Sequence, residues 1–316
     1  MFVSCLLSSL ALVDCFITIA RRVAVRTVSI KFHPNHVLLL NEVLKLSFAA
    51  IQVASRKRKS TALRAHLRRV LLDSVHMVPI CALYLVANLI SYPALERVPV
   101  SVFASVSQLK VLTTALFTVL LLKNPVSLRR WRTLTTLMLG VIVVTLTTAP
   151  DDEKHPATNA RYYFGAFLSF FQTCLTGFAC VALELLLKNQ QETDFLRTDS
   201  SLDIWDRNLQ LALWSIVIYL PLAIIEGDGK LLLTPTHAEI LISCLHAVGG
   251  ILVALSILHA SSIAKTIAVC AGLVMTSLVG GLVGDAPPSL VAMTGGAVVV
   301  ITIFGYRDDM DLEREL

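Results

Sequence analysis

One apolar stretch carries two polar side chains in its interior: Ser105-Val-Ser-Gln-Leu-Lys110-Val-Leu-Thr-Thr-Ala-Leu-Phe-Thr-Val-Leu-Leu-Leu122. It is long and apolar enough to lie within a lipid bilayer, yet it contains Gln108 and Lys110. A lysine at the centre of a membrane helix costs roughly 2.5–3.5 kcal/mol on insertion scales. Lys110 is therefore expected to face a polar cavity or a partner, and the rest of the chain is expected to build that cavity.

The composition of the whole chain agrees with this reading. Of 316 residues, 55% are hydrophobic and only 16% are charged, and the mean hydropathy is +0.73. An ordinary soluble domain has about 25% charged residues. The apolar runs do not alternate with polar residues as the strands of a membrane β-barrel do. The sequence therefore predicts an all-α membrane protein that crosses the bilayer many times.

Ten apolar runs have about the 20 residues that a helix needs to cross the hydrocarbon layer. They cover residues 2–20, 36–54, 73–94, 100–122, 130–149, 162–187, 208–226, 238–258, 264–284 and 289–306. No basic segment precedes the first run and no small-residue cleavage site follows it. The first run is therefore expected to be a retained helix rather than a removed signal peptide.

The distribution of Lys and Arg predicts the orientation of these spans. The loops on one side, together with the C-terminal tail, hold 17 basic residues, and the loops on the other side hold 8. Because basic residues are enriched in cytosolic loops, both termini are expected to be cytosolic. The basic segment 21–31 falls on the other side, so either the rule is broken locally or the first helix is misplaced.

A polar linker divides the chain into two halves. Residues 1–150 form one set of five spans, residues 151–161 form the linker, which is expected to be lumenal, and residues 162–306 form the second set. Residues 307–316 follow as a cytosolic tail. Because five is odd, the second half enters the membrane from the opposite side, which predicts two inverted five-helix repeats. Very short turns follow the third and eighth spans, and Lys110 and Lys265 come after them in the next span of each half.

The motifs of several enzyme classes are absent from the sequence. It contains no nucleophile elbow, no HExxH, no Walker loop and no GxGxxG, so an enzyme is not supported and no cofactor or metal is expected. The seven cysteines lie inside apolar runs, where they are expected to be small buried residues. The net charge of +5 comes from basic residues in connecting loops, which set topology and do not indicate a nucleic-acid partner.

The polar residues inside the predicted spans are the candidates for function, and they are few. They are Glu42, Lys45, Tyr84, Asn88, Gln108, Lys110, Glu184 and Lys265. Lys110 has no acidic residue three or four positions away, so its partner is either Glu42 across the bundle or an anionic substrate. Lys265 matches it in the other half. Two such lysines favour a ligand with more than one negative charge, such as a phosphate or pyrophosphate.

The other polar residues have plainer alternatives. Glu42 and Lys45 lie three residues apart and can form a structural ion pair or take part in the site. Asn88 can bond a neighbouring helix or line the cavity. Glu184 lies four residues before Lys188 near a predicted cytosolic helix end, so it is expected to form an exposed pair there.

These residues give the chain its resemblance to the nucleotide-sugar transporter family of the Golgi and endoplasmic reticulum, within the drug/metabolite transporter superfamily. The matching pieces are Asn41-Glu-Val-Leu-Lys-Leu46, Tyr84 with Asn88, Gln108-Leu-Lys-Val-Leu-Thr-Thr-Ala-Leu-Phe117, Gly177-Phe178, Glu184-Leu-Leu-Leu-Lys188, Trp205-Asp-Arg-Asn-Leu-Gln210, Gly249-Gly-Ile-Leu-Val-Ala254 and Ile263-Ala-Lys265. The branch that it resembles most transports CMP-sialic acid, UDP-galactose or UDP-N-acetylglucosamine.

The resemblance implies an antiporter of the Golgi or endoplasmic reticulum membrane. It would bring a cytosolic pyrimidine nucleotide sugar, of the UDP-galactose or UDP-N-acetylglucosamine type, into the lumen and return the nucleoside monophosphate. The residue roles implied are phosphate contacts from Lys110 and Lys265, base or ribose contacts from Tyr84, Asn88 and Gln108, and a site lining from Glu42 and Lys45. The cavity would lie between spans 2, 3, 4, 7, 8 and 9 and open to each side in turn.

Several positions depart from the family pattern. Ala87-Asn88-Leu89 stands where the family often has Gln-Asn-Asn, and Ser107 and Phe103 stand where tyrosines are expected. Leu258-His-Ala-Ser-Ser262 replaces a segment that usually carries a lysine and an aspartate. The phosphate contacts are thus kept better than the base and sugar contacts, and the substrate is not assigned by the sequence.

Two alternatives remain at this point. The cargo can be CMP-sialic acid instead. The same fold can also carry another phosphorylated metabolite or a small organic solute, which the altered positions favour. The chain can also be a membrane scaffold without transport activity that binds a glycosyltransferase, with the tail 307–316 as its contact surface. A homodimer is left open.

Overall fold

The structure is a computed structural model that describes residues 2–27, 34–56, 60–147, 160–195, 203–226, 236–280 and 289–315. Every regular element within these residues is a helix. The elements are α1 (Phe2–Thr27), α2 (Pro34–Arg56), α3 (Ser60–Asp73), the 3-10 helix η1 (Ser74–Met77), α4 (Val78–Leu95), α5 (Val100–Ser107), α6 (Lys110–Leu121), α7 (Leu128–Thr147), α8 (Ala160–Phe195), α9 (Ile204–Glu226), α10 (His237–His259), α11 (Ser262–Gly280) and α12 (Leu290–Glu315).

Each of the ten predicted spans overlaps at least one of these helices. In the described part of the chain, nine helical segments are long and apolar enough to cross a membrane. The predicted span that is not among them is α7, because its first five residues include Arg129, Arg130 and Arg132 and lower its hydropathy. The chain is therefore an all-helical membrane protein, as predicted, whereas the inverted arrangement of its halves stays a prediction.

The surface of the helices agrees with a lipid environment. Large apolar side chains are widely exposed, among them Phe167 at 59%, Ile225 at 73% and Ile301 at 70%. Soluble monomers rarely expose apolar surface on this scale. In a bilayer these side chains face hydrocarbon, and the helices satisfy their backbone hydrogen bonds internally.

The described helices fall into two packed units. Unit 1 comprises Met1–Cys15, Leu83–Leu185 and Ala260–Leu316, and unit 2 comprises Phe16–Ala82 and Leu186–His259. Each unit therefore takes helices from both halves of the sequence. The predicted division of the chain at the linker 151–161 stays a prediction, since most of that linker lies outside the described residues. In the predicted tail, α12 continues as a helix to Glu315.

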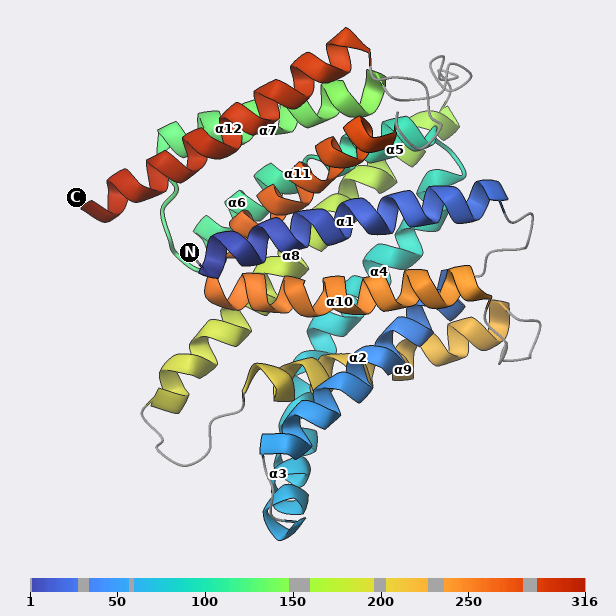
Figure 1. Ribbon diagram of the computed structural model, residues 1–316, viewed down its shortest axis with the longest axis vertical. Coiled ribbons are helices and arrows are strands. Elements are labelled where there is room, and N and C mark those ends of the chain that lie inside the picture. The colour runs from blue at the N-terminus through green and yellow to red at the C-terminus, as the bar shows by residue number, and fades with distance from the viewer. Residues whose placement is uncertain are drawn as a thin grey trace. The chain divides into compact units, whose positions relative to one another are not determined.

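Unit 1 has its core between α6, α7, α11 and α12. This core consists of Val111, Ala115, Leu134, Leu137, Val141, Val144, Ile263, Ile267, Cys270, Val274, Val299 and Tyr306. Helices α7 and α12 lie side by side (Figure 1). The two helices approach closely at their glycines. A Cβ added to Gly140 would lie only 2.9 Å from Val299 Cγ2, and one added to Gly295 only 3.1 Å from Val144 Cγ2. Small residues allow such close packing of membrane helices.

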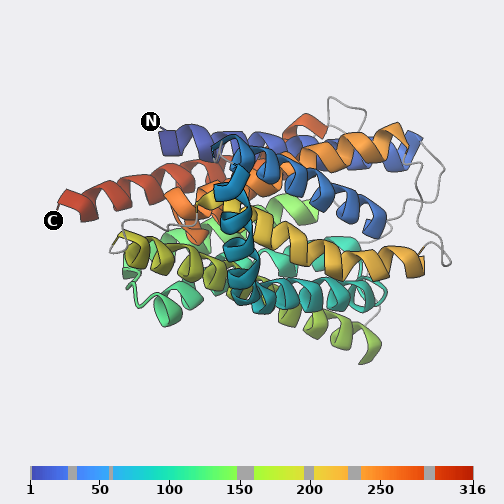
Figure 2. The ribbon, with the colours of Figure 1, turned by 90° about the horizontal axis from the view of Figure 1, so that it is seen from below.

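Unit 2 is built around α2, which packs on both α9 and α10. Figure 2 shows α2 in blue beside α10 in orange. At one end Ala49, Val53 and Leu209 form a small core with Val70 of α3, and the ring of Phe48 meets that of Trp205 edge to face at 5.5 Å. Helix α3 is thus held to the rest of unit 2 by apolar contacts of Leu67 and Val70 and by polar contacts with α9.

Candidate functional site

The predicted span 100–122 is not one continuous helix, because it breaks at Gln108 and Leu109 between α5 and α6. The amide N–H of Gln108 bonds Ser105 O and that of Leu109 bonds Val106 O, both with the shorter 3-10 spacing. In a regular α-helix the backbone N–H of Gln108 would donate to Ala104 O. Here the side chain of Gln108 donates to that oxygen instead, from Nε2 at 3.0 Å. Gln108 is therefore a buried residue that stabilises the break.

The break places Lys110 at the first position of α6. Helix α6 packs on α11 within unit 1, and Lys265 lies in the first turn of α11. Both lysines are half-buried and lie within electrostatic range of one another. Cys270 Sγ, also on α11, donates a long hydrogen bond of 3.9 Å to Gln108 Oε1. Gln108 and Lys110 thus lie where α5 gives way to α6, on a helix that packs against the one carrying Lys265, and their role in a substrate site stays a prediction.

The positive charges of Lys110 and Lys265 repel one another. This repulsion costs more free energy where water is partly excluded. An anion placed between them would relieve the repulsion. The N-terminus of α11 is already capped, because Ser262 N donates to Glu184 Oε2 at 2.7 Å and Ala264 N donates to Ser261 Oγ at 3.1 Å. The backbone N–H groups of Ser262 and Ala264 are therefore already used and are not open to a ligand.

The prediction that Glu184 lies in an exposed pair is wrong as to its exposure. Glu184 is 1% exposed and caps α11 from α8, while Ser262 Oγ donates to Cys180 O at 3.1 Å. The spacing of four residues suggested a surface pair, but the packing of α8 against the start of α11 turns this carboxylate inward. Its place beside the first turn of α11 fixes the backbone that carries Lys265.

Asp14 on α1 is a residue that the sequence analysis missed. It lies in unit 1, within electrostatic range of Lys110, and its Oδ2 would lie 3.0 Å from a Cβ on Gly272 of α11. Gly272 therefore allows α1 to approach α11 at this point. An acidic residue inside an apolar run was the available signal. Asp14 offsets part of the positive charge of the two lysines.

Tyr84 and Asn88 lie one turn apart on the part of α4 that belongs to unit 1. Both are half-buried, and the backbone carbonyl of Asn88 accepts a hydrogen bond from Ser91 Oγ at 2.6 Å. A spacing of four residues places their side chains on the same face of the helix. Their predicted contact with base or ribose stays a prediction.

Glu42 and Lys45 belong to unit 2 and form an ion pair with 2.6 Å between Nζ and Oε1. Asn41 Nδ2 donates to the same Glu42 oxygen at 3.2 Å, whereas the buried Oε2 has no hydrogen-bond partner within the described residues. Lys45 lies against α10, where a Cβ on Gly250 would stand 2.9 Å from Lys45 Cδ. The local pair that the sequence predicted is therefore present, and its role in a substrate site stays a prediction.

Unit 2 also holds a polar network that the sequence analysis did not identify. Arg207 of α9 donates to Asp73 at the end of α3 and, at 2.7 Å, to Gln210 Oε1. Gln210 Nε2 in turn donates to Val70 O at 2.7 Å, and His66 lies 2.9 Å from Asp206 Oδ1. These contacts fasten α3 to α9. The partners are up to 140 residues apart, so no local spacing could indicate them.

A family comparison now adds to the geometry. The model of a family described as "Nucleotide-sugar transporter" matches residues 2–307. This chain belongs to the nucleotide-sugar transporter family. As a member of a transporter family, it is a multi-pass membrane transporter and not an enzyme.

Individual relatives agree with the family assignment. The chain is 26% identical over 299 residues to the UDP-galactose/UDP-N-acetylglucosamine transporter of Caenorhabditis elegans, covering 92% of this chain and 78% of that protein. It is 28% identical over 287 residues to the UDP-galactose transporter of Schizosaccharomyces pombe, covering 87% and 78%. The UDP-N-acetylglucosamine transporter of Bos taurus is 26% identical over 288 residues, covering 86% and 84%.

A known crystal structure supports the fold alone. It superposes with a TM-score of 0.66 at 14% identity, covering 95% of this chain and 94% of that one. The helical arrangement of this family member therefore has a counterpart among solved structures.

Proposed function

We propose that this chain exchanges a cytosolic pyrimidine nucleotide sugar, of the UDP-galactose or UDP-N-acetylglucosamine type, for a lumenal nucleoside monophosphate. The observation that carries the proposal is the pair Lys110 and Lys265, two like charges on packed helices of a membrane protein. A nucleotide sugar presents a pyrophosphate and a nucleoside monophosphate presents a phosphate, so both cargoes can neutralise the same two ammonium groups. A shared anion site is what an exchanger requires.

The other predicted residues would divide the remaining tasks. Tyr84 and Asn88 would contact base or ribose from α4. Gln108 would act mainly by holding the turn that presents Lys110, since its amide group already bonds Ala104 O and Cys270 Sγ. Glu42 and Lys45 pair with one another within unit 2, and their part in binding substrate stays a prediction.

Alternating access would follow from two inverted repeats. Helices that are five predicted spans apart pack directly on one another within the units: α2 on α9, α6 on α11 and α7 on α12. Pairs of this kind are expected where an approximate two-fold axis relates the halves, because equivalent elements meet near the axis. This pairing supports the inverted repeat. The proposal also places the protein in a Golgi or endoplasmic reticulum membrane, with both termini in the cytosol.

A transport assay tests the exchange. Purified protein in liposomes preloaded with UMP or CMP should take up a labelled UDP-sugar faster than in empty liposomes, because a returning monophosphate resets the site. A panel of UDP-galactose, UDP-N-acetylglucosamine and CMP-sialic acid identifies the cargo. Equal uptake with and without preloading, for all donors and with folded protein, would contradict the proposal.

Two positions of α5 favour a different cargo from the UDP-sugars. Ser107 and Phe103 replace the tyrosines expected there, and Ser107 Oγ is used locally, since it donates to Phe103 O at 2.8 Å. A site without these two phenols could serve CMP-sialic acid or another phosphorylated metabolite. Competition separates the cases: free UMP and CMP should inhibit a nucleotide-sugar carrier and leave the carrier of a non-nucleotide substrate unaffected.

A further inference from the structure

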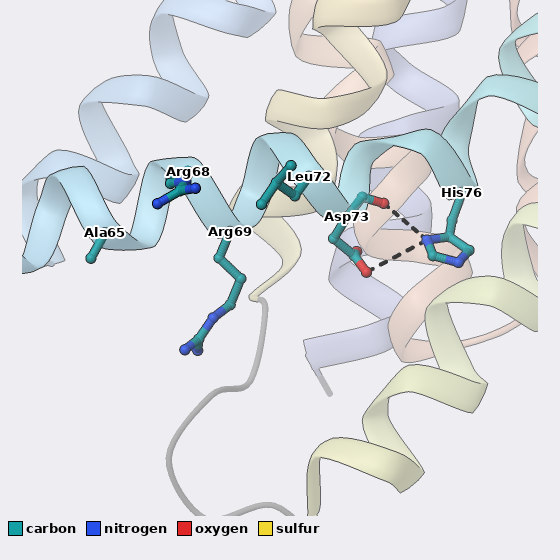
Figure 3. A pocket seen from close by; sticks show the side chains of 6 residues that line it. All are labelled: Ala65, Arg68, Arg69, Leu72, Asp73 and His76. Atoms are coloured by element: carbon teal, nitrogen blue, oxygen red, sulfur yellow. Dashed lines mark hydrogen bonds and ion pairs between the residues drawn. The ribbon is translucent and has the colours of Figure 1, made fainter.

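Helix α3 lies outside the predicted cargo site, yet it carries the pocket that the structure describes (Figure 3). It connects α2 to η1 and α4, and α2 and α4 are both parts of predicted membrane spans. From Arg64 onward α3 forms the start of the candidate span Arg64–Leu95, and its arginines are expected where that segment meets the membrane surface. The excess of Lys and Arg in this loop places that surface on the cytosolic side.

The pocket has a volume of about 510 Å³, and it is lined by Ala65, Arg68, Arg69, Leu72, Asp73 and His76. Arg68 and Arg69 are exposed, and within the described residues neither forms an ion pair. Leu72 is 70% exposed between them and η1. Guanidinium groups next to an exposed leucine form a surface that is both cationic and apolar.

The one acidic group of the pocket does not cancel this charge. Asp73 already binds the buried guanidinium of Arg207, and it accepts a further, weaker contact from Gln210 Nε2 at 3.5 Å. Figure 3 shows Asp73 also facing His76, whose Nδ1 lies 3.1 Å from the backbone oxygen of Asp73. The two exposed arginines therefore keep an unbalanced positive charge, while the network below them holds the end of α3 in place.

Apolar side chains continue the surface toward the membrane span. Leu71 is 49% exposed and Val75 is 61% exposed, and with Leu72 they lead from the arginines toward α4. Helices that combine basic residues with exposed leucines bind in the plane of anionic membranes. Arginine also suits phosphate because its planar group donates two parallel hydrogen bonds.

We propose that this pocket binds the phosphate-bearing headgroup of an anionic phospholipid in the cytosolic leaflet. Arg68 and Arg69 contact the phosphate, and Leu71, Leu72 and Val75 contact the glycerol and upper acyl chains. A lipid satisfies both halves of the surface, whereas a free phosphate would leave the leucines exposed. The proposal is independent of the cargo that the protein carries.

A lipid titration tests the proposal. The full-length protein is purified in detergent, freed of lipid and titrated with short-chain phosphatidylserine, with bound lipid counted by native mass spectrometry. Arg68→Gln with Arg69→Gln should weaken binding roughly 30-fold, from about fivefold for each arginine at a membrane surface. The matched control is Arg129→Gln with Arg132→Gln, which removes the same charge from two exposed arginines of α7 and should change binding less than about twofold.

Two further arms distinguish a lipid from a soluble anion. Leu72→Ser should weaken phosphatidylserine binding but leave the binding of soluble glycerophosphoserine unchanged, because only the lipid contacts the leucine. The proposal is overturned if the two double variants lose binding equally, or if glycerophosphoserine or UMP competes as well as the lipid does. Thermal unfolding of each variant should match that of the wild type, since the replaced side chains are exposed.

Discussion

The polar residues inside unit 1 and those inside unit 2 are arranged in opposite ways. In unit 1, Lys110 and Lys265 are like charges that repel, with Asp14 as a partial counter-charge. In unit 2, Arg207 binds Asp73 and Lys45 binds Glu42, so that opposite charges neutralise one another. The two lysines of unit 1 thus carry like charges with only Asp14 as a nearby opposite charge, whereas each of these basic side chains of unit 2 has an acidic partner.

This difference separates binding from structure by a physical criterion. Removing one partner of a neutral buried pair leaves an unbalanced charge and destabilises the fold. Removing one of two like charges relieves repulsion and damages only the binding of an anion. The two units should therefore respond to charge-removing substitutions with opposite changes in stability.

The largest effect is expected for Arg207→Ala. The side chain is 7% exposed and bonds both Asp73 and Gln210, so its loss should lower the free energy of unfolding by about 3–5 kcal/mol. Chemical unfolding in detergent measures this. Arg132→Ala, at an exposed position, is the control and should change stability by less than about 0.5 kcal/mol. A loss below about 1 kcal/mol for Arg207→Ala would show that the pair is not structural.

The next effect is expected for Lys110→Met, which keeps the aliphatic chain and removes the charge. Exchange should fall about 100-fold, equivalent to about 2.7 kcal/mol, while thermal stability in the absence of substrate stays equal or rises. Lys123→Met, at the exposed end of the same span, is the control and should transport normally. Normal exchange in Lys110→Met, or a large loss of its stability, would remove the distinction between the two units.

The sequence predicted the positions of the membrane spans better than the breaks within them. Apolar runs of about 20 residues locate the spans, because length and hydropathy are local properties. The break at Gln108 was not predicted, since it depends on the side chain of Gln108 replacing a backbone donor for Ala104 O. A polar residue in an apolar run indicates a special position, but it does not indicate whether the helix continues through it.

Repetition between the two halves gave the signal for the candidate site. Lys110 and Lys265 were chosen because they occupy corresponding positions in the two halves; α6 packs on α11, and the role of the lysines in a site stays a prediction. Asp14 was missed because nothing near it in the sequence carries a complementary charge. Arg207 and Asp73 are 134 residues apart, and Glu184 and Ser262 are 78 apart, so their contacts follow from tertiary packing alone.

A smaller effect is expected where Lys45 meets α10. In Gly250→Ala the new Cβ would lie 2.9 Å from Lys45 Cδ, so the end of the lysine side chain must move, and we expect its pair with Glu42 to lengthen. The free energy of unfolding should fall by about 1–2 kcal/mol. Gly305→Ala is the matched control, because no atom lies within 4 Å of its added Cβ, and it should be neutral or stabilising. Equal behaviour of the two variants would mean that the Glu42–Lys45 pair tolerates displacement.

The smallest effect concerns Asp14, whose charge opposes that of the two lysines. In Asp14→Asn the side chain keeps its size beside Gly272 but no longer offsets Lys110, so the empty site becomes more positive. UMP should then bind about three- to tenfold more tightly, measured by calorimetry at low ionic strength, and 0.5 M salt should reduce the gain because it screens the interaction. Asp308→Asn removes an exposed carboxylate at the far end of α12 and should leave UMP affinity unchanged. Weaker UMP binding in Asp14→Asn would mean that Asp14 orients the lysines toward the ligand. The excess positive charge of Lys110 and Lys265 would then not by itself explain anion binding in unit 1.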